Sequence, residues 1–168
     1  MSGLRVLVQG EHAISADDDA VLATVLGSCI AACLRDPVTG IGGMNHFLLP
    51  EGSESGPAAV KYGLHAMELL INGLTRAGAS RQRLQGKLFG GARMLRGLPD
   101  IGAANARFAT EFLRREGIAD LGGSLGGDRG RKIRFWPATG RVQQQFLDPA
   151  EVFERPFVAP PRNEPILF

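Results

Sequence analysis

Two apolar segments joined by a turn sequence constrain the fold of this chain more than any other feature. The first covers residues 29–34 and the second covers residues 41–48. Between them stands Asp36-Pro37-Val38-Thr39-Gly40, which combines three residue types that favour tight turns. Proline fixes φ, glycine permits a left-handed backbone, and an aspartate side chain can bond its own backbone two residues on. The pattern predicts a β-hairpin over residues 29–49, and Pro50 ends it.

Segments typical of strands and helices alternate along the rest of the chain, which predicts an α/β (α+β) fold. Residues 58–77 carry Val60, Leu64, Met67, Ile71 and Leu74 at a four-three spacing, as one apolar face of a helix requires. A second helix is predicted over residues 101–116. Strands are predicted over the following ranges: 4–8, 21–26, 87–89, 118–121, 131–136 and 141–146.

The length of 168 residues favours one domain, which we place at residues 1–148. Residues 149–168 hold five of the ten prolines and form a predicted Pro-rich C-terminal tail. The tail ends in the apolar sequence Ile166-Leu167-Phe168, which we expect to pack on the body of the protein.

Composition excludes several classes of protein. The chain is 44% hydrophobic and 21% charged, as in ordinary globular domains. Its net charge of +2 does not imply a nucleic-acid partner. The longest uncharged apolar stretch, residues 20–34, is too short to cross a bilayer, so no membrane insertion is expected. The first residues lack the pattern of a signal peptide, and a cytoplasmic location is therefore expected.

The predicted hairpin carries the most informative chemical groups. Gly27-Ser28-Cys29 stands at its start and Asn45-His46 near its end. A turn centred between Pro37 and Val38 would place Cys29 directly opposite His46, with both side chains on one face. A register shifted by one residue would put them on opposite faces.

A nucleophilic thiol needs such a base, and the base needs a third group to orient it. From the residues alone, that third group is Thr24, Ser28 or Asn45. The alternative reading of Cys29 is a buried small hydrophobe.

Metal and nucleotide sites are not expected. Cys29 and Cys33, together with three scattered histidines, match none of the common zinc spacings, so we expect no metal and no cofactor, and we place Cys33 in the core. The glycine-rich stretch over residues 122–131 lacks both common phosphate-binding motifs. We expect Arg129 and Arg131 in this stretch to be available to acidic side chains of a partner.

Several ordered motifs resemble one protein family. Thr24-Val25-Leu26-Gly27-Ser28-Cys29, Arg35-Asp36-Pro37 and Asn45-His46-Phe47-Leu48-Leu49-Pro50 are similar to the signature of CheD, the chemoreceptor glutamine deamidases of bacterial chemotaxis. Further blocks follow in the same order, among them Lys61-Tyr62-Gly63, Phe89-Gly90-Gly91-Ala92, Ile101-Gly102 with Asn105, and Gly130-Arg131-Lys132. The resemblance covers about residues 4–146.

The resemblance implies a mixed β-sheet core with flanking helices, a fold shared with deamidating toxins. It implies a protein-glutamine deamidase that converts glutamines of methyl-accepting chemotaxis receptors to glutamate through a cysteine thioester, releasing ammonia. On this reading Cys29 is the nucleophile, His46 the base and Thr24 the third catalytic residue. Ser28, Asn45 and Gly27 are expected to contact the substrate.

A second reading belongs to a different class. The resemblance also allows a non-catalytic docking module that binds receptors or a CheC-type phosphatase. That role needs no thiol, so the presence of both Cys29 and His46 favours the enzyme. We expect a monomer in either case.

Overall fold

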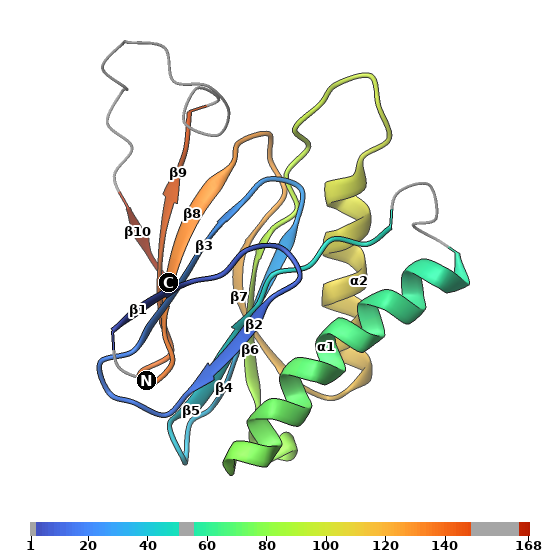
Figure 1. Cartoon of the computed structure of the whole chain (residues 1–168). Helices are drawn as coiled ribbons and strands as arrows, with labels where there is room; N and C mark the ends of the chain where they lie inside the picture. Colours follow the sequence, from blue (N-terminus) through green and yellow to red (C-terminus); the bar gives the residue numbers. More distant parts are fainter. Residues whose placement is uncertain (1–2, 51–55, 149–164) are drawn as a thin grey trace.

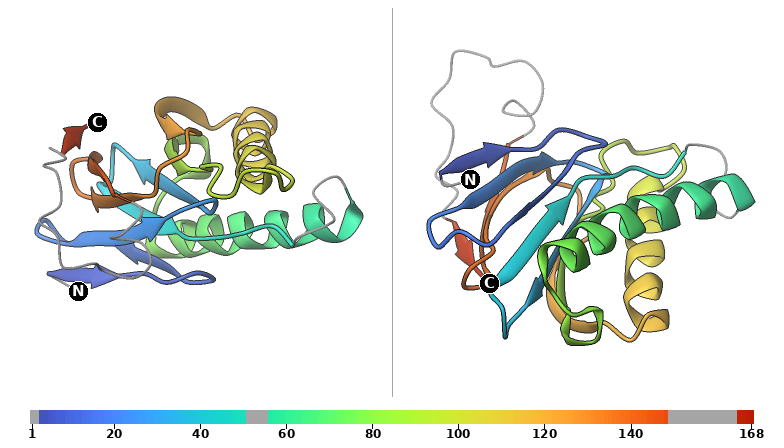
Figure 2. Two further views of the ribbon diagram at one scale, coloured as in Figure 1. Left: turned by 90° about the horizontal axis from the view of Figure 1, so that it is seen from above. Right: turned by 60° about the horizontal axis from the view of Figure 1, so that its bottom comes forward.

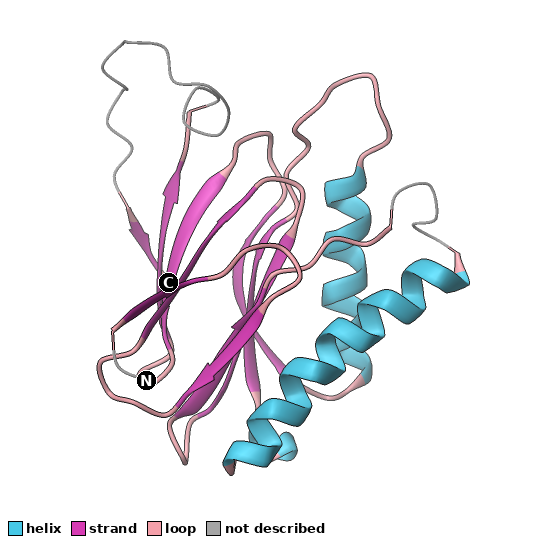
Figure 3. Cartoon of the chain, viewed as in Figure 1, coloured by secondary structure: helices cyan, strands magenta, loops and turns pink. Residues whose placement is uncertain are grey.

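The computed structural model describes residues 3–50, 56–148 and 165–168. Within them the chain builds three layers, with two β-sheets lying face to face and two helices covering the outer face of one sheet (Figures 1 and 3). The prediction of an α/β (α+β) fold, with a mixed β-sheet core and flanking helices, is confirmed.

The first sheet has the strand order β1-β3-β8-β9-β10, and the second has the order β2-β5-β4-β6-β7. The first sheet contains β1 (Leu4–Val6), β3 (Val21–Leu26), β8 (Arg131–Trp136), β9 (Arg141–Phe146) and β10 (Ile166–Leu167). The second contains β2 (His12–Ser15), β5 (Ile41–Asn45), β4 (Ile30–Asp36), β6 (Gln85–Gly90) and β7 (Ala119–Leu125). The helices are α1 (Pro57–Ala77), α2 (Ile101–Arg115) and the short 3-10 helix η1 (Arg81–Arg83). Two pairs, β1 with β3 and β6 with β7, are parallel, and the other pairs are antiparallel.

Strand β4 is apolar on both faces because it lies between two separate cores. Ile30, Ala32 and Leu34 pack against the helices, in a cluster with Met67, Leu70 and Phe112 among others. Ala31 and Cys33 point the other way, into a cluster between the two sheets. Alternating side chains of one strand therefore stabilise both interfaces.

The hairpin of β4 and β5 is present, but its predicted register is wrong. Cys33 lies opposite Met44, and Asp36 lies opposite Ile41, so the turn centres between Val38 and Thr39, one residue later than predicted. Residues 37–40 form the turn, and Gly40, at φ 74°, donates its N–H to Asp36 O at 2.9 Å. This register places His46 across from Ala31. Cys29, two residues before Ala31, is then the diagonal neighbour of His46 on the same face.

Most predicted elements are confirmed to within a few residues, whereas β2 and β10 were missed. Both are short, and β10 pairs with β9 only at Ile166 and Leu167. Residues 149–164 of the predicted tail lie outside the described residues. The expectation that its apolar end packs on the body is confirmed, because the Phe168 ring meets the Phe89 ring edge to face at 5.4 Å.

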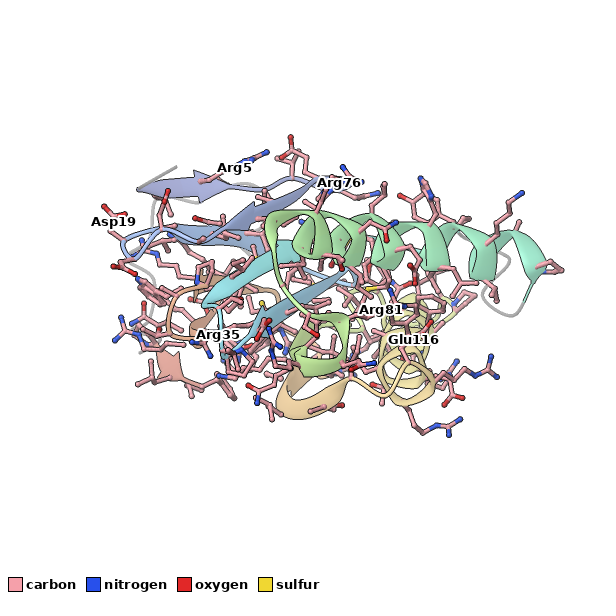
Figure 4. All side chains as sticks on the ribbon, turned by 90° about the horizontal axis from the view of Figure 1, so that it is seen from below. Arg5, Asp19, Arg35, Arg76, Arg81 and Glu116 are labelled. Carbon is pink, nitrogen blue, oxygen red and sulfur yellow. The ribbon has the colours of Figure 1, made fainter. Side chains whose placement is uncertain are left out.

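Charged side chains join the elements at the end of the molecule where α1 finishes. Arg81 lies between Glu68 and Glu116, at 3.0 and 3.4 Å (Figure 4). Nearby, the buried Asp36 carboxylate accepts hydrogen bonds from Arg83 and from the backbone of Val38 and Ser80. None of the described helices has the length and apolar character needed to cross a membrane.

Candidate active site

The side chains singled out in the sequence gather at the opposite end of the sheets. Figure 1 shows the connections β3–β4, β6–α2 and β7–β8 together at the upper end of the view, and Figure 2 shows the same layers from two other sides. Cys29 belongs to the first connection, and His46 directly follows β5. Strand ends from both sheets therefore contribute to one site.

The loop of residues 27–29 is held by all three of its carbonyl groups. These bonds run from Ala92 N to Gly27 O at 3.0 Å, from Asn105 Nδ2 to Ser28 O at 2.8 Å, and from Gly91 N to Cys29 O at 2.9 Å. Each donor comes from the β6–α2 connection or from α2. The loop conformation is therefore fixed from one side.

The fit of this loop against β6 requires a glycine. Gly90 has φ 110°, and a Cβ at that position would lie 2.0 Å from Cys29 O, so a side chain is excluded. The amides of the loop remain available, because no acceptor is recorded for the N–H of Ser28 or of Cys29 among the described residues. Two free N–H groups beside a thiol are the arrangement that stabilises an oxyanion.

Thr24 and His46 form the shortest contact of the site. Thr24 Oγ1 lies 2.7 Å from His46 Nδ1 and donates its proton to Leu7 O at 2.8 Å. Because the hydroxyl has a single proton, which it gives to Leu7, it accepts from Nδ1–H of the neutral ring. The lone pair of the imidazole is then on Nε2, where a base would need it.

Cys29 is half-buried and its thiol donates to Gln9 Oε1 at 3.9 Å. Among the described residues no hydrogen bond joins this thiol to His46. Burial raises the pKa of Cys29 to about 11 and lowers the pKa of His46. Both groups are therefore uncharged at neutral pH in the free protein, and the thiol needs a base when substrate arrives.

The remaining predicted site residues lie in different places. Gly27 and Ser28 belong to the loop itself, and Ser28 lines an apolar cavity of about 90 Å³ with Met94 and Leu98. Asn45 points to the other face of β5, where its side chain accepts from Ala32 N at 3.0 Å and contacts Met67. The structure thus brings Thr24, Ser28 and His46 to the Cys29 end of the sheets but turns the Asn45 side chain away.

Sequence reasoning gave no role to two residues that touch this site. Gln9, in the β1–β2 connection, contacts the thiol, and an exposed loop glutamine carries no signal in a single sequence. Asn105 bonds the 27–29 loop from α2, where it is fully buried. A polar residue within the apolar stripe of the predicted second helix was the available signal.

The glycine-rich stretch over residues 122–131 does not expose both of its arginines, and the second, Arg131, is the first residue of β8. Arg131 is 1% exposed, and its guanidinium donates to Ser124 O at 2.7 Å and also bonds Gly126 O. Burial lowers the pKa of Arg131 to about 10. The expectation that Arg131 meets acidic groups of a partner is wrong, because the side chain folds back to hold its own connection. Among the described residues no cluster of three or more His, Cys, Asp or Glu side chains could hold a metal ion.

Comparison with known proteins places the chain in a family. Residues 48–146 match the family model described as CheD chemotactic sensory transduction. A probable chemoreceptor glutamine deamidase CheD of Caulobacter sp. (strain K31) is 56% identical over 164 residues, which cover 94% of this chain and 87% of the relative. The protein of the same name from Rhizobium leguminosarum bv. trifolii (strain WSM2304) is 53% identical over 165 residues, covering 93% and 89%.

Among solved structures, a Neisseria meningitidis protein of the family DUF152 superposes with a TM-score of 0.46 and 10% identity, over 69% of this chain and 53% of the other. That likeness is too low to support an argument. The sequence matches are high and nearly full-length, and the chain belongs to the CheD family.

Proposed function

We propose that this protein is a protein-glutamine deamidase that converts glutamines of chemoreceptors to glutamate. Cys29 is the nucleophile, His46 the base, and Thr24 the residue that orients His46. The observation that carries the proposal is the bond of 2.7 Å between Thr24 Oγ1 and His46 Nδ1, which leaves Nε2 as the basic nitrogen on the face shared with Cys29. The names of the relatives supply the substrate class.

The reaction begins when a glutamine carboxamide displaces Gln9 from the thiol. Neutral His46 removes the thiol proton through Nε2, and Cys29 Sγ attacks the carboxamide carbon. Negative charge then develops on the carbonyl oxygen, where the N–H groups of Ser28 and Cys29 stabilise it. Gly27 begins the same loop and stays a proposed substrate contact, and no contact of Asn45 with substrate is included.

The tetrahedral intermediate collapses when the C–N bond breaks. His46 gives its proton to the departing nitrogen, ammonia leaves, and a thioester joins the substrate to Cys29 Sγ. Water, deprotonated by His46, attacks the thioester and releases glutamate with the thiol restored. Each converted side chain gains one negative charge. The steps use groups of this chain together with one water molecule, so no cofactor is required.

The biological setting follows from the substrate class. Receptor glutamines accessible to such an enzyme lie in the cytoplasm, where thiols stay reduced. We place this protein there, acting on the receptors without inserting into the membrane or binding nucleic acid. Binding to a CheC-type phosphatase and a monomeric state both stay predictions.

The test is mass spectrometry of a receptor cytoplasmic fragment after incubation with the protein, with Cys29→Ala and with Cys33→Ala. Cys33 is a matched control because its thiol is buried between the sheets, away from the site. We expect a unit mass gain at defined glutamines with the unaltered protein and with Cys33→Ala, and none with Cys29→Ala. Equal activity of Cys29→Ala, or no conversion by the folded, reduced protein, would overturn the proposal and favour a docking role.

A further inference from the structure

The ladder between β4 and β5 stops short of the 27–29 loop. Its last rung joins Ile30 and Phe47, which exchange two hydrogen bonds of 2.9 Å each. In an antiparallel pair such doubly bonded rungs recur at every second residue. The next rung in this register would join Ser28 and Leu49 through two direct backbone bonds, one in each direction.

The Asn105 side chain occupies the position of that rung. Leu49 donates its N–H to Asn105 Oδ1 at 3.1 Å, and Asn105 Nδ2 donates to Ser28 O at 2.8 Å. The carboxamide therefore replaces one direct bond, from Leu49 N to Ser28 O, with a bridge of two. The reciprocal bond has no replacement, and the Ser28 N–H has no recorded acceptor among the described residues.

The packing of α2 makes this insertion possible. A Cβ at Gly102 would lie 2.2 Å from Ala92 O, so only glycine lets the first turn of α2 approach the β6–α2 connection so closely. One turn later Asn105 is 0% exposed, and burying an amide is costly unless its polar atoms are bonded. Both ends of this amide are bonded, one to Ser28, which precedes Cys29, and the other to Leu49, in the segment that follows His46.

We propose that Asn105 is a positioning residue that holds the hairpin open and thereby frees the Ser28 N–H for the oxyanion. Without the inserted amide, Ser28 and Leu49 would close into a regular rung, and the Ser28 N–H would donate to Leu49 O. The same bridge fixes the segment after His46 relative to Cys29. This inference rests on the proposed deamidation and adds a residue that touches neither the substrate nor the reacting atoms.

The test compares two reactions of Cys29. Deamidation develops an oxyanion, whereas alkylation by iodoacetamide is a displacement at carbon that develops none. Removing one oxyanion donor lowers kcat by about 10²–10³-fold, so we expect Asn105→Ala to lower kcat for a receptor peptide at least about tenfold with little change in KM. Its alkylation rate should stay within about threefold of the unaltered protein. Asn72→Ala, an exposed asparagine on α1, is the control and should change neither rate.

A second variant keeps the test sharp if Asn105→Ala folds poorly. In Asn105→Asp, only the protonated carboxyl can donate to Ser28 O, and burial favours that neutral form. We expect the deamidation rate of Asn105→Asp, divided by that of the unaltered protein, to rise as pH falls from 8 to 6. The alkylation rate of Asn105→Asp, divided in the same way, should not show this rise, whereas a role in packing alone predicts the same pH dependence for both reactions.

Three results would overturn the inference. They are a kcat of Asn105→Ala within about threefold of the unaltered protein, equal losses of deamidation and alkylation in Asn105→Ala, or the same pH dependence of both reactions in Asn105→Asp. Failure of the proposed function looks different. In that case the unaltered protein itself would convert glutamine no faster than Cys29→Ala does.

Discussion

Replacing Thr24 with valine tests how the base is oriented. Valine keeps the volume and branching of threonine but removes the hydroxyl. That hydroxyl bridges His46 Nδ1 at 2.7 Å and Leu7 O at 2.8 Å, and Thr24 is only 2% exposed, so water does not easily take its place. Two buried polar groups then lose their partner.

The magnitude follows from the cost of such groups. A buried donor or acceptor left without a partner costs about 1–3 kcal/mol. The Leu7 carbonyl takes no part in the reaction, so the cost of leaving it without a partner should lower the free energy of unfolding. The cost of leaving His46 Nδ1–H without a partner should lower kcat/KM, because the ring is no longer held with Nε2 as the base. A loss of about 1–3 kcal/mol corresponds to a decrease of about 5- to 150-fold in kcat/KM.

The assay is ammonia release from a receptor peptide, with urea unfolding of the same samples. Thr75→Val is the matched control, because Thr75 also donates to a backbone carbonyl, Ile71 O at 2.9 Å, but on an exposed turn of α1. We expect Thr24→Val to lose activity and stability and Thr75→Val to keep its activity. If Thr24→Val retains kcat/KM within twofold while folded, the assigned role of Thr24 is wrong.

Three further predictions concern the Cys29 thiol, the Asp36 carboxylate and the Phe168 ring. Because burial raises the pKa of Cys29 to about 11, its alkylation by iodoacetamide should accelerate throughout pH 7–10, and a plateau by pH 8 would contradict this. Hydrogen bonds from Arg83 hold the pKa of Asp36 well below its usual range, so the stabilisation is complete at neutral pH and lost as pH falls below about 4. Urea unfolding at pH 7 and pH 3 should therefore show a smaller acid loss for Asp36→Asn, and equal losses would refute the assignment. Phe168→Ala removes the ring contact with Phe89 and should lower the free energy of unfolding by about 2 kcal/mol, against no change if the tail end contributes nothing.

Local patterns determined most of the architecture. The four-three spacing from Val60 to Leu74 predicted α1, although Val60 and Leu64 of that stripe are exposed. The turn signals around Pro37 predicted the hairpin of β4 and β5, and the strands predicted over residues 131–136 and 141–146 are present as β8 and β9. Strand β2 was not predicted, because its four residues carry no strand pattern of their own and form a strand by pairing with β5. The arrangement into two facing sheets depends on contacts between distant segments, which no local pattern specifies.

In the candidate site too, the sequence was sufficient for some features, whereas others depend on contacts that no local pattern specifies. Cys29, His46 and Thr24 were identified from residue types and family resemblance, and the parity of the predicted register was sufficient to place Cys29 and His46 on one face. The predicted centre of the turn was one residue too early, because the bond of the Gly40 N–H to Asp36 O was not evident in the sequence. Asn105 gave one signal, as a polar residue within the apolar stripe of the predicted second helix, but its role could not be predicted because that role depends on how closely α2 approaches the 27–29 loop.

In the proposed reaction Cys29 forms a covalent bond with a glutamine side chain and ammonia leaves. Rapid acid quench of the protein with a glutamine peptide, followed by intact-mass and peptide analysis, tests it most directly. We predict an adduct on Cys29 that equals the peptide mass minus one ammonia, is cleaved by hydroxylamine, and is absent from Cys29→Ala. Conversion of glutamine without any such adduct, or an adduct on Cys33 instead, would mean that Cys29 is not the nucleophile.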